Sequence, residues 1–189
     1  MARIGLNLTT LILAATEIAD NQGLEAVTLA YLAKKLKIQS PSLYNHVNGL
    51  PDLRRQLALS GLAQMSLDFR RAMADKSGDE AVEAFSYAYL AFARAHPGLY
   101  EATQRAAEPD DIEMKEAGAV LVQLALKALE GYGLKGDEAI HAVRGIRSML
   151  HGFASLERQG GFGLKLDLDV TFRQLIHTFL EGTKAINTK

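Results

Sequence analysis

Hydrophobic and polar residues alternate along this chain with the period of an α-helix. The pattern is clearest near the N-terminus, where apolar side chains recur at spacings of three and four: Leu8, Leu11, Ile12, Ala15, Ile18 and Ala19. Polar residues occupy the other side of this segment, and Gly23 is a natural helix stop. The pattern therefore predicts a first amphipathic helix that ends near Gly23.

Two shorter helices are expected next. Thr28 suits the N-cap of a helix whose apolar members are Leu29, Leu32, Ala33 and Leu36. Ser40 followed by Pro41 pairs an N-cap with a proline at the first helical position, which starts a new helix abruptly. This third helix is predicted to be short, roughly Pro41 to Val47.

The rest of the chain repeats the helical period in longer segments. The predicted helices cover about residues 51–74, 79–95, 110–131, 137–158 and 168–186, and a short irregular piece begins at Pro97-Gly98. Strand signals are weak because β-branched residues are few and scattered. We therefore predict an all-α fold of about nine helices, with no internal repeat.

Composition excludes several classes of protein. The 189 residues include no cysteine, which excludes disulfides, thiolate metal sites and cysteine nucleophiles. There is no stretch of about 18 uncharged apolar residues and no signal-peptide pattern, so we expect a soluble, cytoplasmic protein without a membrane partner. Paired carboxylates, a glycine-rich phosphate loop, a zinc-protease motif and a nucleophile elbow are also missing, which argues against an enzyme.

Charge is distributed unevenly, although its total is near zero. Residues 1–60 carry a net charge of +2 and residues 61–189 a net charge of −3. This bias is compatible with a nucleic-acid contact near the N-terminus, but it is too small to argue for one alone.

The two short helices and their connection fit a helix-turn-helix, in which the second helix reads DNA. Small Ala33 lies where the two helices cross, and Ile38, Leu43, Leu36 and Val47 would fill the angle between them. The second helix then exposes side chains that hydrogen-bond to base edges or phosphates, namely Gln39, Ser40, Ser42, Tyr44, Asn45 and His46.

These residues carry a family resemblance. The stretch from Gly23 to Val47, with Leu32-Ala33 and Ser42-Leu43-Tyr44-Asn45-His46-Val47 inside it, resembles the N-terminal DNA-binding domain of TetR/AcrR-type transcriptional regulators. The resemblance implies a DNA-binding domain over residues 1–50, and a helical domain over residues 51–189 that binds an effector and dimerises. It also implies contacts to DNA from Thr28, Lys37, Gln39, Ser40, Pro41, Ser42, Tyr44, Asn45 and His46.

The chain departs from the family pattern at two positions. Many members place a glycine in the turn and a lysine at the start of the next helix, where this chain has Lys37 and Leu50. A left-handed backbone at Lys37 is expected to cost about 1 kcal/mol, although its charge can bind phosphate. Leu50 cannot replace a phosphate-binding ammonium, which leaves Arg54 or Arg55 as substitutes.

The C-terminal part resembles TetR-type regulators whose effector domain has a Trp-His-Gly-like motif. The resemblance rests on residues 95–100, on residues 151–157 and on Gly160-Gly161-Phe162, with Met149 or Leu150 at the tryptophan position. A metal at His151 is disfavoured because His141 lies ten residues away, not on one face of the helix. We expect no metal and no cofactor, and we expect His151-Gly152 to admit a neighbouring helix.

Two sets of residues are candidates for the effector and dimer sites. An apolar pocket with a few polar anchors is expected among Tyr89, Phe92, Tyr100, Arg105, Met114, Arg147, Met149 and His151. Apolar stripes on the last two helices are expected to form the dimer interface, through Ile146, Met149, Leu150, Phe153, Phe172, Leu175, Ile176 and Phe179.

The sequence thus predicts a homodimeric, ligand-responsive repressor that binds a palindromic operator in double-stranded DNA and responds to an unidentified small molecule. The alternative is a helical enzyme or small-molecule-binding protein that keeps the fold without binding DNA.

Overall fold

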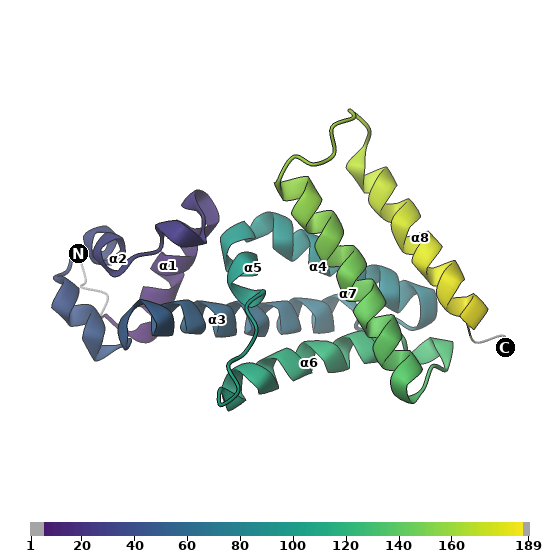
Figure 1. Ribbon diagram of the computed structural model, residues 1–189, viewed down its shortest axis with the longest axis horizontal. Helices are drawn as coiled ribbons and strands as arrows, with labels where there is room; N and C mark the ends of the chain where they lie inside the picture. Colours follow the sequence, from purple (N-terminus) through teal and green to yellow (C-terminus); the bar gives the residue numbers. More distant parts are fainter. Residues whose placement is uncertain (1–5, 187–189) are drawn as a thin grey trace. The chain divides into compact units, whose positions relative to one another are not determined.

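The computed structural model describes residues 6–186, which form eight α-helices and three short 3-10 helices (Figure 1). They are α1 (Leu8–Gln22), η1 (Leu24–Ala26), α2 (Leu29–Leu36), η2 (Ser40–Asn45), α3 (Gly49–Ala72), α4 (Gly78–Ala95), α5 (Pro97–Thr103), α6 (Ile112–Ala128), η3 (Glu130–Tyr132), α7 (Gly136–Arg158) and α8 (Leu168–Ile186). No strand occurs in this range. The predicted all-α fold is confirmed, and the predicted helical segments correspond to α1–α4, α6–α8 and η2. The piece from Pro97 that was predicted to be irregular is helical instead and forms α5, with Pro97 at its first position. Within the same range, no helix combines the length and the apolar character needed to cross a membrane.

The chain packs into two compact units. The first unit contains the residues up to Gln64 together with Ala95–Ala117, and the second contains Met65–Arg94 and the residues from Gly118 onward. Helices α3 and α6 each contribute to both units. These units are defined by which residues pack together, and not by function. The predicted functional domains, residues 1–50 and 51–189, therefore stay a prediction.

The first unit is fastened by a close contact between α1 and α5. A Cβ atom at Gly98 would lie only 2.1 Å from the backbone carbonyl of Ala19, so only glycine fits there. The Asp20 carboxylate accepts hydrogen bonds from the N–H groups of Gly98 and Leu99 at 3.0 and 2.9 Å, and it contacts Nδ1 of His96 at 2.9 Å. These N–H groups belong to the first turn of α5 and have no partner within the helix, so Asp20 satisfies them.

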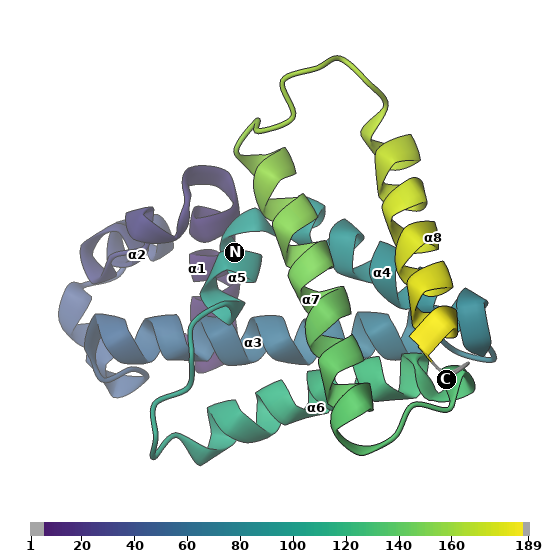
Figure 2. The same ribbon diagram turned by 45° about the vertical axis from the view of Figure 1, so that its right-hand side comes forward.

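The second unit includes an antiparallel pair of helices, α7 and α8, which lie side by side in both views (Figures 1 and 2). Arg94, at the end of α4, ties this pair together. Its guanidinium binds the Glu157 carboxylate through two hydrogen bonds of 2.7 and 2.9 Å, and Asp169 at 2.8 Å. The rings of Phe153 of α7 and Phe172 of α8 also pack against each other, with their centroids 4.8 Å apart.

Burial corrects part of the predicted dimer interface. Five of its eight residues are buried inside the chain itself, with at most 4% of each exposed: Ile146, Leu150, Phe153, Phe172 and Ile176. They are core residues, because the two stripes face each other and the rest of the second unit. Only the half-buried Met149, Leu175 and Phe179 keep surface for a partner.

The expectation for His151-Gly152 also needs correction. No atom lies within 4 Å of a Cβ built at Gly152, so no neighbouring helix of the chain requires this glycine. The close approach that a glycine permits occurs instead at Gly98.

Replacing Gly98 by alanine should destabilise the protein by about 3 kcal/mol, because the new methyl group meets backbone that cannot move without parting α1 from α5. Gly118→Ala is the matched control, since a Cβ at this helical position meets nothing within 4 Å. It should stabilise the protein by about 0.5–1 kcal/mol. Urea unfolding of both variants measures the difference, and equal effects would contradict the proposed contact.

Candidate nucleic-acid interface

The helix before the turn begins as the sequence predicts. Thr28 has an extended backbone, and its Oγ1 accepts a hydrogen bond from the Tyr31 N–H at 3.2 Å. Thr28 is therefore the N-cap of α2, and its exposed position leaves the first turn open to solvent. A free helix start of this kind offers N–H groups to a phosphate.

The turn itself is built on Lys37. Its backbone is left-handed, with φ 55° and ψ 42°. The Lys37 N–H donates to the Lys34 carbonyl at 3.2 Å, and the Ile38 N–H donates to the Ala33 carbonyl at 3.0 Å. This pair of bonds is the Schellman ending of a helix, which usually has glycine where this chain has lysine. The predicted left-handed strain at Lys37 is therefore present.

The helix after the turn differs from the prediction. It is a 3-10 helix over Ser40–Asn45 whose N-cap is Gln39, and no side chain caps it. Ser40 lies inside the first turn instead of capping it, so the Ser40 cap and the Pro41–Val47 boundaries were wrong. The small core beneath is as expected for Ala33, Leu43 and Val47, which are buried, whereas Leu36 and Ile38 are half-buried.

The predicted DNA-contacting residues share one exposed surface. Tyr44 is 59% exposed. Gln39, Pro41 and Asn45 are exposed as well, and Ser40, Ser42 and His46 are half-exposed. Within residues 6–186, the polar side chains of this segment make no hydrogen bond to the rest of the chain. We call residues 39–46 the reading surface, since its donors and acceptors are free for an external partner.

Two exposed cations stand beside the reading surface. Among residues 6–186, neither Lys34 nor Lys37 forms an ion pair, whereas Lys35 binds Glu17 at 2.8 Å. The two arginines expected to replace the missing lysine are both engaged.

Arg54 contacts Glu25 at 3.0 Å. Arg55 holds the Asp111 carboxylate with two hydrogen bonds of 2.6 and 2.7 Å, and it reaches Glu113 at 2.8 Å. The hydrogen bond from Arg55 lowers the pKa of Asp111 below its usual range. Arg55 therefore stabilises the protein itself and is not held ready for a phosphate.

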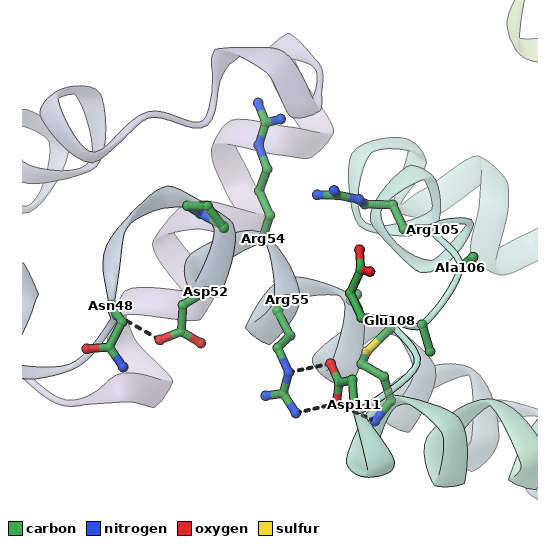
Figure 3. A pocket seen from close by; sticks show the side chains of 12 residues that line it. Asn48, Asp52, Arg54, Arg55, Arg105, Ala106, Glu108 and Asp111 are labelled. Carbon is green, nitrogen blue, oxygen red and sulfur yellow. Dashed lines mark hydrogen bonds and ion pairs between the residues drawn. The ribbon is translucent and has the colours of Figure 1, made fainter.

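A pocket of about 360 Å³ lies in the same unit, between the start of α3 and the connection from α5 to α6 (Figure 3). Of the eight residues predicted for an effector site, Arg105 and Met114 line it. The other six lie elsewhere: Tyr89, Phe92 and Tyr100 are buried, Met149 and His151 are half-buried, and Arg147 is exposed. The pocket also contains Arg54, Arg55 and Asp111. The sequence does not predict that these residues meet, because no local pattern indicates a contact between Arg55 and Asp111, which are 56 positions apart.

Comparison with known proteins identifies relatives for both parts of the chain. The family model described as "Tetracyclin repressor-like, C-terminal domain" matches residues 82–179. The uncharacterised HTH-type transcriptional regulator YobS of Bacillus subtilis is 38% identical over 187 residues, which cover 99% of this chain and 97% of YobS. An uncharacterised HTH-type transcriptional regulator of Mycobacterium tuberculosis is 33% identical over 89% of this chain and 78% of that protein.

Solved structures share the fold. A TetR variant from Acinetobacter baumannii AYE, in complex with minocycline, superposes with a TM-score of 0.73 at 18% identity, over 97% of this chain and 99% of that chain. Membership of the Trp-His-Gly subgroup stays a prediction.

Replacing Lys37 by glycine should stabilise the protein by about 1 kcal/mol, because glycine adopts the left-handed backbone without steric cost. Lys37→Ala is the control, since alanine removes the charge but keeps the strain. Urea unfolding should therefore give a gain for glycine and none for alanine. A gain of the same size in both variants would mean that the charge, and not the backbone, is destabilising.

Proposed function

The chain belongs to the TetR family of helix-turn-helix transcriptional regulators, and we propose that it is a ligand-responsive repressor that binds a palindromic operator as a homodimer. The observation that carries this proposal is the reading surface: six neighbouring polar side chains, exposed or half-exposed on η2 and the residues that flank it, form no side-chain hydrogen bond within residues 6–186. Free donors and acceptors on one short helix are what the major groove requires.

Each part of this surface has a distinct task in the proposed complex. Gln39, Ser42 and Asn45 contact base edges or nearby phosphates, and the Tyr44 hydroxyl contacts the phosphate backbone. The N-terminus of α2, capped by Thr28, binds a second phosphate. Lys34 and Lys37 add salt-dependent affinity that does not depend on base sequence.

One copy of this surface is too small to select a site in a genome, and this favours a two-fold dimer. Two reading helices about 34 Å apart would contact successive major grooves of a palindrome. The second unit offers apolar surface for such a dimer: Leu156 is 48% exposed on α7, and Val170 is 43% exposed on α8. A shallow apolar groove between these helices, lined partly by Leu156 and Leu175, extends that surface.

The proposed response to a ligand follows from the difference between two states of the dimer. A ligand can release DNA only if it binds more tightly to the state in which the reading helices no longer match the operator. An activator would bind DNA in the same way, but its operator would lie at a different position relative to the promoter.

Selection of bound duplexes from a random pool tests the DNA-binding role. We expect a palindrome to be recovered, and we expect Tyr44→Ala and Ser42→Ala each to weaken binding at least about tenfold. Ser148→Ala, an exposed serine of α7, is the control and should bind as the wild type does. Recovery of no preferred sequence would favour the alternative of a helical binding protein or enzyme that does not bind DNA.

Sedimentation velocity tests the dimer. Leu156→Glu and Val170→Glu should each produce a monomer at concentrations where the wild type is a dimer, because a charge would be buried at the interface. Leu67→Glu alters an equally exposed leucine of α3 and should leave the dimer intact. A dimer that survives both substitutions would place the interface elsewhere.

A further inference from the structure

The pocket of the first unit has the size and composition of a small-molecule site. Its volume of about 360 Å³ falls within the range of ligand pockets. Apolar surface comes from Pro51 and Ala58 of α3, from Ala106 and Ala107, and from the buried side chain of Met114. The pocket can therefore cover the apolar body of a ligand.

Two arginines of the pocket have unused hydrogen-bonding capacity. The Nε of Arg54 is buried and has no hydrogen-bond partner, while its other end reaches the exposed Glu25. Arg105 forms no ion pair within residues 6–186, and its guanidinium projects across the pocket (Figure 3). Burying a donor without a partner is costly, so an acceptor brought to Arg54 would be favourable.

The carboxylates that line the pocket do not neutralise these two arginines. Asp111 is held by Arg55 and accepts the Met114 N–H at 3.1 Å, and Asp52 accepts the Asn48 N–H at 2.8 Å. Glu108 is the remaining carboxylate, and it points toward Arg105 (Figure 3). It is exposed and forms no side-chain hydrogen bond within residues 6–186, so it can turn away into water.

We propose that this pocket binds a small organic carboxylate, with its charged end at Arg54 and Arg105 and its apolar body against Met114 and Ala58. A carboxylate fits this arrangement because guanidinium groups bind its two oxygens directionally. The neutral amide of the same shape has one acceptor oxygen and no charge, so it can accept the Arg54 Nε–H but cannot also pair with the Arg105 guanidinium.

Such a ligand would act on the reading surface through the chain that joins them. This step rests on the proposed DNA-binding function. One wall of the pocket is the first turn of α3. Asn48 lies in the short connection from η2 to this turn, and its N–H donates a hydrogen bond to the Asp52 carboxylate of α3. The opposite wall is the connection from α5 to α6. A carboxylate that draws the two walls together would shift the start of α3 and the helix before it.

Isothermal titration calorimetry with the full-length protein tests the site directly. The probes are butyrate, hexanoate, octanoate and benzoate, each compared with its neutral amide. We expect at least one carboxylate to bind about tenfold more tightly than its amide. Arg105→Gln should remove this preference, and Glu108→Gln should strengthen carboxylate binding about threefold, because the competing negative charge is gone. Arg71→Gln, an exposed arginine of α3 outside the pocket, should change nothing.

The outcomes separate this inference from the proposed function. If no carboxylate outbinds its amide, or if Arg105→Gln binds carboxylate as well as the wild type, the site is overturned even when an operator has been found. If a carboxylate binds as expected, its addition should release the recovered operator from the wild type at concentrations that leave Arg105→Gln bound. Unchanged operator binding would overturn the coupling. Failure to recover any operator would contradict the proposed function, while the calorimetry still decides the site.

Discussion

The first unit depends on the contact between α1 and α5. Asp20 satisfies the free N–H groups at the start of α5, and Gly98 lets the two backbones meet without a side chain between them. The two residues lie 78 positions apart, so this contact brings a segment from the middle of the chain into the unit that carries the helix-turn-helix. Within the first unit, it fixes α5 against the helix that precedes the helix-turn-helix.

The first unit contains a second long-range contact, between Arg55 of α3 and Asp111 at the start of α6. The two-pronged ion pair between Arg55 and Asp111 places the start of α6 beside the start of α3, and Asp111 also caps α6 through the Met114 N–H. Because these bonds lower the pKa of Asp111, their stabilisation is complete above the ordinary pKa of an aspartate. It is lost as the pH falls through the lowered value. The Asp111 carboxylate thus caps α6, holds α6 against α3 through Arg55, and lines the pocket.

Local features were predictable from the sequence, and long-range ones were not. The Thr28 cap and the long helices follow from local residue types and spacing, because neighbouring residues decide them. The left-handed Lys37 was expected only from the resemblance to a family that has glycine in this turn. The 3-10 geometry of η2 was missed, since a serine before a proline fits an N-cap and a first turn almost equally well. Periodicity found the apolar stripes of α7 and α8 but could not tell that Leu150 and Phe172 face the chain's own core. The pocket was missed for the same reason, since its arginines and carboxylates meet only in the folded chain.

The distribution of cations explains why a lysine is tolerated in the strained turn. Leu50, at the start of α3, has no charge to offer a phosphate, and the nearby Arg54 and Arg55 are engaged in ion pairs. Lys34 and Lys37, a few residues before the reading surface in sequence, are exposed and form no ion pair within residues 6–186. A glycine in the turn would relieve about 1 kcal/mol of strain but would remove one of these two charges. In the proposed complex with DNA, a phosphate contact from Lys37 releases counterions, and this gain in binding free energy offsets a strain that the turn has with or without DNA.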